Sequence, residues 1–486
     1  MRIGIDFGTT NCTICEFDMD GSPRILGPIP STGFWCNGEF VFGQTALDQL
    51  SSNRKDLHPI RALKLSLGDQ NELNFGGTTI ATEKAAAALF SQLYSLIGGR
   101  SPEEVEEVVL ATPVLMKAAH RESLTASARQ AGLMNCRLVY EPTAALIGAG
   151  ILEQVPESGA VLIVDWGGGT LDLSVVRIGD GVFREAAVRG EAASLGGTDM
   201  DNQICLRVLN QNPELKRQLS KVHHGVIRLA AEIEQEKINF LEAFDPDDEV
   251  LIAPEWLDEI IELKREMVYD VIDGFTDRAI GEVEQMLETS DIPEERLDYI
   301  IFAGGTCRAD RIRNRITDRF RGLAEISVTA PQTLTGVGCA RLASQGFSLR
   351  LAANFCVRQV DNSICVLLEK GIDLDTSSYR TAEFIVTDPT CPDAYVELGV
   401  STGSDPGDIL NRVAEKFLAL ENFSLAAGRT PNQAMKPVLE HVSISAGISP
   451  DLTVTVYGET AIAGASHSVK VAGVPLAIHV DGASPR

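Results

Sequence analysis

Hydrophobic and polar positions change their spacing near residue 345, and this change divides the chain into two parts. Before that point, short apolar segments with strand spacing alternate with longer segments in which apolar residues recur every three or four positions. Such alternation predicts a layered α/β fold. Predicted strands lie at residues 2–6, 12–17, 105–112, 138–140, 160–165, 171–176, 185–188 and 297–302, and predicted helices at 54–67, 82–97, 118–131, 144–152, 196–209, 227–241 and 257–288.

The remainder of the chain, from residue 346, has the pattern of an all-β domain. Short alternating strands separated by turn residues predict a β-sandwich. A segment at 410–420 is a helical-looking interruption. The sequence therefore predicts two domains, 1–345 and 346–486. The strands of the second domain are expected at 354–359, 363–369, 381–386, 395–400, 442–448, 452–457 and 469–471.

Composition narrows the class of protein. The chain has 486 residues, 44% of them hydrophobic and 23% charged, which is ordinary for a globular protein of more than one domain. Its formal charge of −26 argues against nucleic acid or an anionic membrane surface as the main partner, although an acidic surface also aids solubility. No apolar run approaches the roughly 18 residues of a membrane helix, and no secretory leader is visible. With ten scattered cysteines, these features predict a cytoplasmic protein with reduced thiols.

A candidate phosphate-binding hairpin opens the chain. The first strand ends in Asp6, and the turn that follows carries Gly8, Thr9 and Thr10 before a second apolar strand. An aspartate at a strand end can hold a divalent cation through water. The glycine lets the backbone approach a ligand, neighbouring N–H groups can point at a phosphate, and the two hydroxyls add donors. Many hairpins carry Asp and Gly at the turn, so this motif alone is a weak signal.

A second copy of the same pattern strengthens this interpretation. Residues 160–170 again run from a buried strand through Asp165 and an aromatic residue to three glycines and Thr170. Two such hairpins predict two similar lobes that face each other across a cleft with a nucleotide between them. A third glycine turn, at residues 303–308, follows a strand and again places backbone near a ligand. The sequence contains no G-x-x-x-x-G-K-[ST] motif, which excludes a P-loop as the phosphate site.

Five signatures, in this order along the chain, resemble the seventy-kilodalton heat-shock chaperones of the DnaK type. They are residues 4–11 (GIDFGTTN), 141–145 (EPTAA), 165–172 (DWGGGTLD), 195–197 (LGG) and 304–305 (GG). Their order and spacing match along about the first 345 residues. The resemblance implies an actin-like ATPase domain, whose duplicated ribonuclease-H-like lobes hold ATP or ADP and Mg²⁺ between them.

The resemblance also implies roles for individual residues. Asp6 and Asp165 would lie near the magnesium ion, and Lys64 would offset charge on the transferred phosphoryl group. Glu141 would orient or activate the attacking water, and Thr170 would lie beside the γ-phosphate. The other implied cofactor-binding residues are Gly8, Thr9, Thr10, Asn11, Gly167, Gly168 and Gly169 at the phosphates, Gly196 and Gly197 at a helix start, and Gly304, Gly305, Thr306, Arg308, Glu234 and Lys237 around the adenosine.

Several of these residues also have plain structural interpretations. Without the resemblance, Lys64 is a helix-surface lysine, Glu141 is an acid that favours a helix start, and Lys237 belongs to a solvated charge run. Pro113 and Arg121 match positions that the family uses to relay the nucleotide state. They fit a strand stop and a surface cation equally well.

The second domain resembles the β half of the chaperones' peptide-binding domain, most plainly at residues 442–456. By that resemblance, an extended peptide would bind in an apolar groove through main-chain hydrogen bonds and side-chain pockets. The alternative is that the same residues form only the core of the sandwich. The residues in question are Phe355, Val357, Val396 and Leu398.

Three departures from the family pattern limit what the resemblance implies. Only a short loop, residues 68–80, separates Lys64 from the next helix, where the family inserts a small subdomain. Docking of exchange factors on that lobe is therefore in doubt. The stretch 344–353 lacks the family's leucine-rich linker, so we expect weaker or different coupling of ATP to peptide binding. No helical lid follows the last predicted strand, so a bound peptide is expected to exchange quickly.

We therefore interpret the chain as a chaperone-like ATPase that hydrolyses ATP slowly and thereby controls binding of unfolded or extended polypeptide. The resemblance adds a J-domain co-chaperone and an exchange factor as partners, and it implies neither nucleic acid nor a membrane. The alternatives are an actin-like filament-forming ATPase, a small-molecule kinase of the same superfold, and an ATP-binding scaffold without folding activity. The appended β domain argues against the filament.

Overall fold

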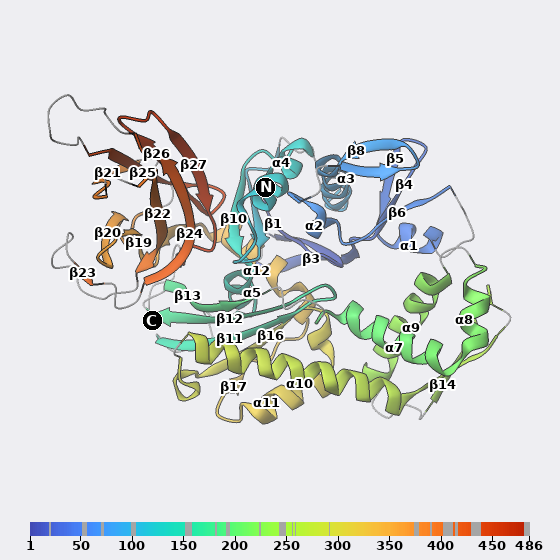
Figure 1. Ribbon diagram of the computed structural model, residues 1–486. Coiled ribbons are helices and arrows are strands. Elements are labelled where there is room, and N and C mark those ends of the chain that lie inside the picture. Colours follow the sequence, from blue (N-terminus) through green and yellow to red (C-terminus); the bar gives the residue numbers. More distant parts are fainter. Residues whose placement is uncertain are drawn as a thin grey trace.

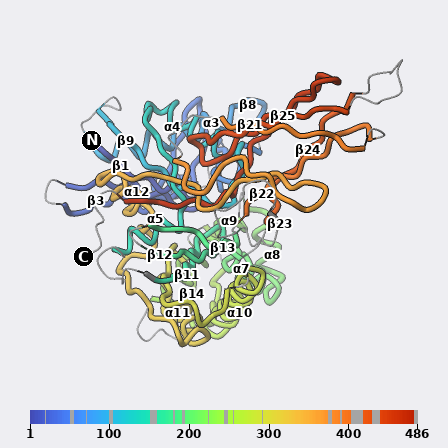
Figure 2. Tube along the Cα trace, turned by 90° about the vertical axis from the view of Figure 1, so that its left-hand side faces the viewer, coloured from blue at the N-terminus to red at the C-terminus, as the bar shows by residue number. Residues whose placement is uncertain are grey.

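The computed structural model describes residues 1–18, 21–50, 56–69, 72–98, 104–150, 158–179, 182–190, 195–222, 225–242, 249–254, 256–257, 259–290, 292–373, 379–388, 391–401, 412–413, 417–428 and 439–480. Two α/β units, called lobe I and lobe II below, lie one above the other, and a β-sandwich lies beside lobe I (Figure 1). Figure 2 looks onto the sandwich, whose orange and red strands lie across lobe I. None of the described helices is both long enough and apolar enough to cross a bilayer.

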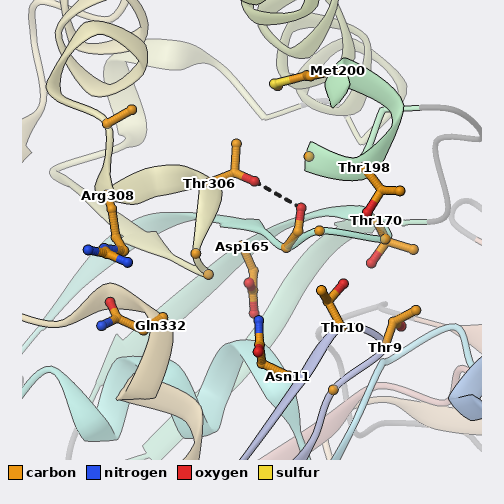
Figure 3. Close-up of a pocket in the computed structure, with 18 of the residues that line it drawn as sticks. Thr9, Thr10, Asn11, Asp165, Thr170, Thr198, Met200, Thr306, Arg308 and Gln332 are labelled. Atoms are coloured by element: carbon orange, nitrogen blue, oxygen red, sulfur yellow. Dashed lines mark hydrogen bonds between the residues drawn. The ribbon is translucent and has the colours of Figure 1, made fainter. Parts of the chain in front are cut away.

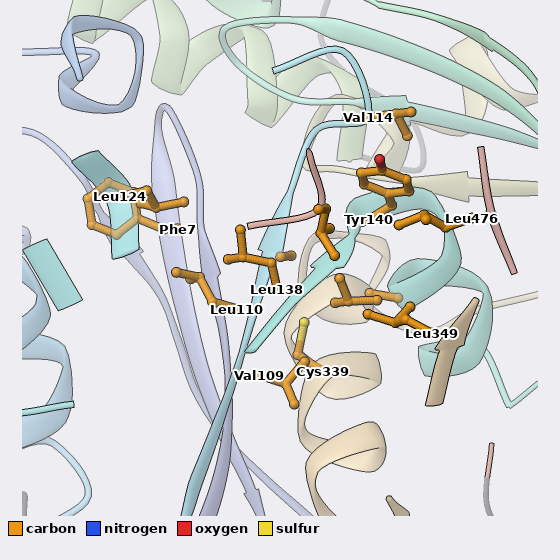
Figure 4. Packing of buried hydrophobic residues seen from close by; sticks show 14 of the residues in the cluster. Phe7, Val109, Leu110, Val114, Leu124, Leu138, Tyr140, Cys339, Leu349 and Leu476 are labelled. Carbon is orange, nitrogen blue, oxygen red and sulfur yellow. The ribbon is translucent and has the colours of Figure 1, made fainter. Parts of the chain in front are cut away.

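Lobe I is built on a five-stranded sheet in the order β10-β9-β1-β2-β3. Gly4 faces helix α12 on one side of this sheet, and Phe7 stacks on Phe90 of helix α3 on the other, with ring centroids 4.6 Å apart. Figure 4 shows Phe7 and Leu124 on one side of the strands and Cys339 on the other. The elements are β1 (Arg2–Phe7), β2 (Asn11–Phe17), β3 (Pro23–Pro30), β4 (Gly33–Cys36), β5 (Glu39–Phe42), α1 (Gln44–Leu50), β6 (His58–Ile60), α2 (Leu63–Ser66), β7 (Glu72–Phe75), β8 (Thr78–Ala81), α3 (Thr82–Ser95), β9 (Glu107–Thr112), α4 (Ala118–Gln130), β10 (Cys136–Tyr140) and α12 (Leu334–Gln345).

Lobe II repeats this arrangement on a seven-stranded sheet in the order β17-β16-β11-β12-β13-β28-β18. Its central hairpin β11–β12 is flanked by the antiparallel β13 and the parallel β16, as the hairpin β1–β2 is flanked by β3 and β9. The elements are α5 (Glu141–Gly148), β11 (Ser158–Trp166), β12 (Leu171–Gly179), β13 (Val182–Arg189), α7 (Gly197–Gln211), α8 (Pro213–Leu219), α9 (Gly225–Glu242), β14 (Glu249–Ile252), β15 (Ile261–Lys264), α10 (Arg265–Thr289), η2 (Glu294–Arg296), β16 (Tyr299–Ala303), η3 (Thr306–Arg308), α11 (Asp310–Arg319), β17 (Ala324–Glu325), η4 (Pro331–Thr333), β18 (Phe347–Leu351) and β28 (Leu476–Val480).

Helices α5 and α12 pack against each other between the two sheets, and glycines allow their close approach. A Cβ added at Gly148 would clash with the carbonyl of Leu334, and one added at Gly338 would clash with the carbonyl of Ala144. The two helix backbones therefore touch directly at this crossing. The crossing fixes the position of α5, which starts with Glu141, relative to both sheets.

The β-sandwich consists of two sheets in the orders β23-β20-β19-β22-β24 and β21-β25-β26-β27. All seven strands predicted for this part of the chain are present, with ends shifted by no more than a few residues. The strands are β19 (Asn354–Arg358), β20 (Ser363–Leu368), β21 (Arg380–Ile385), β22 (Asp393–Ser401), β23 (Arg412–Val413), β24 (Phe417–Ala426), β25 (His441–Ser449), β26 (Thr453–Thr460) and β27 (Ser466–Val471).

The strand pairing differs from the predicted division at residue 345. Strand β28 pairs with β13 of lobe II, and β18 pairs with β28. Both strands lie beyond the predicted boundary, yet they complete the sheet of lobe II on either side of the sandwich segment. The local pattern did not reveal this, because the two strands become adjacent only through pairing between distant parts of the chain. The sandwich is thus attached to lobe II at both of its ends.

Four local predictions were wrong in part. Within the predicted helix 54–67, residues 58–60 form strand β6, and residues 63–66 form the short helix α2. Residues 261–264 of the predicted helix 257–288 form strand β15, and the helix starts at Arg265. Within the predicted helix 410–420, the described residues 412–413 and 417–420 belong to strands, and the others lie outside the described residues. Most of the predicted loop 68–80 forms the antiparallel hairpin β7–β8.

The helix crossing gives a stability test. Gly338→Ala is expected to lower the free energy of unfolding by about 1–3 kcal/mol, because an overpacked contact must be relieved by backbone movement. Urea denaturation followed by circular dichroism measures the change. The matched control is Gly274→Ala in α10, where a Cβ meets no atom within 4 Å. That substitution should stabilise by about 0.5–1 kcal/mol, and equal effects of the two would contradict the crossing.

Candidate functional site

A single pocket between the lobes collects nearly all of the predicted site residues (Figure 3). Lobe I contributes Asp6, the turn 8–11 and Lys64, and lobe II contributes the turn 167–170 together with parts of α7, α9 and the third glycine turn. Every residue predicted for catalysis or cofactor binding lines this pocket except Gly196. Segments far apart in the sequence therefore converge as the repeated motif predicted.

The two hairpin turns lie directly against each other. A Cβ at Gly168 would clash with the hydroxyl of Thr10, and one at Gly169 would lie 2.7 Å from the methyl group of Thr9. Side chains larger than hydrogen would push these turns apart. Figure 3 shows Thr9 and Thr10 from one turn and Thr170 from the other bordering the same space. Because these positions are glycines, the two turns lie close enough together to contact one small ligand group.

A buried ion pair lies at the floor of the pocket. The Nζ of Lys64 donates to Oε1 of Glu141 at 2.5 Å, and the two residues are only 5% and 8% exposed. Lys64 comes from the short helix α2, which follows Ala62 in the left-handed conformation at φ 49°. Burial lowers the pKa of Lys64, but the charges of Glu141 and Asp6 outweigh this effect and raise it overall. The lysine is therefore a fixed positive charge, contrary to its interpretation as a surface residue.

Carboxylates dominate the surroundings of this pair. Burial and the charge of Glu141 raise the pKa of Asp6 to about 7, although Lys64 opposes the shift. Burial, Glu141 and Asp172 likewise raise the pKa of Asp165 well above its usual range. Such shifts mean that the pocket disfavours the ionised form of both aspartates, because burial removes them from water and neighbouring carboxylates repel them. An added cation would favour the ionised forms.

The carboxylates fit a cation that keeps its water. In the described part of the chain, no three His, Cys, Asp or Glu side chains converge closely enough to ligate a metal ion directly. Mg²⁺ usually retains several waters and is held by one or two carboxylates together with phosphate oxygens. Asp6 and Asp165, as acidic oxygen donors on opposite walls, match this mode of binding.

The other end of the pocket is held by pairs between helices. Lys237 of α9 forms an ion pair with Asp201 of α7 at 2.7 Å, and Arg308 forms an ion pair with Glu242. Thr306 donates to the carbonyl of Gly167 at 3.0 Å, which ties the third glycine turn to the second hairpin. Lys237 is therefore a buried, paired group rather than part of a solvated run.

Sequence reasoning missed several lining residues. Asp172 accepts from the hydroxyl of Thr170 at 2.8 Å and was detectable as part of the repeated hairpin. Ile238 and Leu241 of α9 lie four positions after Glu234 and Lys237, so the helical period could have identified these two. The remainder depend on tertiary packing. The missed residues are Asp172, Thr198, Met200, Ile238, Leu241, Glu242, Ala309, Ile312 and Gln332.

Gly196 does not line the pocket. Its N–H donates to Asp199 at 2.9 Å, and a Cβ here would clash with the carbonyl of Gly168. It therefore supports the second glycine turn from behind and starts α7. The motif was correctly located, but this glycine serves backbone packing.

The four residues predicted to line a peptide groove lie in the core of the sandwich. They are between 0% and 5% exposed, because the alternation of β19 and β22 turns them toward the opposite sheet. The groove prediction is therefore not supported for Phe355, Val357, Val396 and Leu398, and their alternative interpretation as core fits.

Pro113 and Arg121 both lie at contacts between parts of the molecule. Pro113 borders a small cavity with Glu141 and Asp165. Arg121 is fully buried, and its guanidinium donates to the carbonyls of Val114 at 2.7 Å and of Leu452 at 2.8 Å. It joins α4 to the sandwich, so it is not a surface cation.

The fold defines a two-lobed α/β protein with a pocket between its lobes. A sequence model described as Hsp70 protein matches residues 43–344, more than half of the chain, so the chain belongs to the Hsp70 family.

Three curated relatives are named chaperone protein DnaK. The protein of Mycoplasma mobile is 26% identical over 357 residues, which cover 70% of this chain and 57% of that protein. The protein of Mycoplasmopsis agalactiae is 26% identical over 353 residues, with the same coverage of 70% and 57%. That of Mycoplasmoides gallisepticum is 25% identical over 355 residues, covering 70% and 59%. The chain thus spans less than two thirds of the length of these relatives.

The pKa of Asp6 gives a pH test. It is about 7 in the folded protein against 3.8 for the unperturbed side chain. Between these values the folded state holds a proton that the unfolded chain has lost, so stability decreases as the pH rises through this range. Asp6→Asn is therefore expected to raise the Tm of the nucleotide-free protein by several degrees at pH 8, and by less at pH 5.

Differential scanning calorimetry at the two pH values checks this expectation. The control is Asp318→Asn, which removes an exposed carboxylate that forms an ion pair with the exposed Arg321 at 3.7 Å and should change Tm little at either pH. If Asp6→Asn left the Tm at pH 8 equal to or below that of the wild type, burial of the Asp6 carboxylate would not be destabilising the folded protein.

Proposed function

We propose that the protein binds ATP with Mg²⁺ between its lobes and hydrolyses it slowly, in an actin-like domain of two ribonuclease-H-like lobes. The observation that best supports this proposal is the meeting of two glycine hairpins in one pocket beside a buried lysine–glutamate pair. The related strand order of the two sheets and membership of the Hsp70 family add independent support.

The phosphate end of the pocket provides the groups that hydrolysis needs. Asp6 and Asp165 hold Mg²⁺ through its coordinated waters, and the bound ion supplies charge neutralisation at the phosphate oxygens. The backbone N–H groups and hydroxyls of the turns 8–11 and 167–170 contact the phosphates. Thr170 lies beside the γ-phosphate, and its hydroxyl is oriented by Asp172.

Lys64 and Glu141, which form the buried ion pair, have different roles in hydrolysis. Lys64 carries a fixed positive charge that offsets the charge developing on the transferred phosphoryl group. Glu141 orients the attacking water or accepts its proton, while the ion pair with Lys64 keeps its carboxylate in place.

The opposite end of the pocket accommodates the adenosine. The third glycine turn, with Gly304, Gly305, Thr306 and Arg308, borders it on one side. Glu234 and Lys237 of α9 border it on the other, and Gly197 lies at the start of α7 between them.

The sandwich binds unfolded or extended polypeptide under control of the nucleotide. The name that the curated relatives carry supports a chaperone role. Apolar side chains exposed on the sandwich are the candidate contacts, in place of the four core residues. They are Tyr379, Ile385, Tyr395, Leu418 and Tyr457.

Family membership supports the proposed partners, and the state of the cysteines supports the proposed compartment. A J-domain co-chaperone and an exchange factor are the partners that the family relationship suggests. No disulfide joins any of the ten cysteines, all of which lie in the described part of the chain. This fits a reducing compartment such as the cytoplasm.

Substitution of the proposed water-orienting residue tests the ATPase assignment. Glu141→Gln keeps the shape of the side chain but removes its charge, so kcat should fall by about 100-fold, within the range for loss of a general base. Affinity for ATP should change only a few-fold. Single-turnover phosphate release measures the rate, and calorimetric titration measures the affinity.

The control for this substitution is Glu39→Gln on an exposed strand position, which should hydrolyse ATP at the wild-type rate. If Glu141→Gln also turned over normally, the catalytic role of this residue would be excluded. Absence of ATP binding to the folded wild-type protein would overturn the whole assignment.

A labelled unstructured peptide tests the polypeptide function. Fluorescence anisotropy with the full chain should reveal binding whose Kd differs severalfold between ATP and ADP, because a controlled site must have different affinities in its two states. Glu141→Gln with ATP should hold the ATP-state affinity over time, whereas the wild type drifts to the ADP value. Equal affinity in both nucleotides would leave an ATP-binding scaffold as the better description.

A further inference from the structure

Tyr140 and Thr143, which lie on either side of Glu141 in the sequence, make contacts that lead toward one short segment near the end of the described chain. The hydroxyl of Tyr140 donates to the carbonyl of Val474 at 3.1 Å. On the other side, the hydroxyl of Thr143 donates to the carboxylate of Glu185. Tyr140, Thr143 and Glu185 are all buried. Their contacts leave Glu141 between two anchored neighbours.

Glu185 connects Thr143 to the same segment. It lies on β13, next to the position where Arg184 pairs with Ala477 of β28. This pairing places Glu185 beside the start of β28, and burial raises the pKa of its carboxyl to about 7. The carboxylate thus lies between the first turn of α5 and the start of β28. Figure 4 shows the ring of Tyr140 beside Leu476 at this place.

The segment 474–476 is the joint between the sandwich and lobe II. Strand β27, the last strand of the sandwich, ends at Val471, and β28 begins at Leu476. The sandwich also contacts lobe I through Lys470, which pairs with Glu122 of α4 and with Asp451. Any displacement of the sandwich therefore acts on this joint.

We propose that Glu185 is a positioning residue that couples the joint at 474–476 to Glu141 through Thr143. The second contact, from Tyr140 to Val474, acts in parallel. Movement of the sandwich then changes the placement of Glu141 and of its partner Lys64, and so changes the rate of ATP hydrolysis. This inference rests on the proposed function, since it assigns Glu141 a role in hydrolysis.

A purely structural role for Glu185 makes different predictions. If the carboxylate only fills space or stabilises the sheet, its loss lowers the Tm without a selective effect on turnover. If it positions Glu141, its loss lowers kcat and leaves the KM for ATP nearly unchanged, because the nucleotide contacts lie on other elements. In the same way, a variant of Thr143 that keeps the hydroxyl, such as Thr143→Ser, should keep the rate close to that of the wild type.

The test uses the full chain and the pair Thr143→Val and Thr143→Ser. The valine keeps the shape of the side chain but removes the donor, so kcat should fall by about ten-fold while KM stays within about two-fold. The serine keeps the donor and should restore kcat to within about two-fold of wild type. Adding Glu185→Leu to Thr143→Val should cause little further loss, since the two residues act as one unit.

Arg184→Gln is the control, because Arg184 is exposed on the same strand and faces away from α5. It should leave kcat unchanged. Wild-type kcat in Thr143→Val, or equal losses in the valine and serine variants, would overturn the proposal while leaving the ATPase assignment intact.

Amide hydrogen exchange provides a second measurement that needs no ATPase activity. Coupling is reciprocal, so Thr143→Val should accelerate exchange in β28 as well as in the first turn of α5, whereas Thr143→Ser should not. Unchanged exchange in β28 would overturn the proposal. If the wild type hydrolysed no ATP, the proposed function would fail, and the exchange data would still decide whether the joint and α5 are coupled.

Discussion

Two opposite charges, removed from water and held against each other, are the interaction on which the rest of the structure depends. Lys64 and Glu141 come from different segments and meet at 2.5 Å below the glycine turns. Burial of each ion costs several kcal/mol, which close pairing offsets only if both partners stay in place. Burial and neighbouring carboxylates raise the pKa values of Asp6 and Asp165, so their ionised forms are unfavourable without an added positive charge.

The helices that hold this pair also connect it to the rest of the chain. Glu141 is the first residue of α5, which crosses α12 where glycines permit backbone contact. Helix α12 leads into β18, and the chain returns from the sandwich through β28 to the same sheet. The sandwich therefore begins and ends on the body that carries the pocket. Attachment at both ends means that its movements reach the pocket through strands as well as through surface contacts.

Most of the residues that line the pocket were predictable because each glycine hairpin is local in sequence. An aspartate, glycines and threonines within ten residues define the hairpin, and its repetition indicated two walls of one cleft. The partner of Lys237, Asp201, could not be predicted in this way, because the pairing depends on how α7 packs on α9. The pairing of strands β18 and β28 in the sheet of lobe II could not be predicted for the same reason. In the sandwich, alternation revealed two faces but not which face is covered, and so a groove and the core remained alternatives for Phe355 and Leu398, which lie in the core.

The most direct test of the central claim is a crystal structure of the full chain with Mg²⁺ and a non-hydrolysable ATP analogue. The account predicts a triphosphate enclosed between the turns 8–10 and 167–170, with Asp6 and Asp165 both reaching the ion through water. A nucleotide bound elsewhere, or held by only one of the two turns, would contradict it.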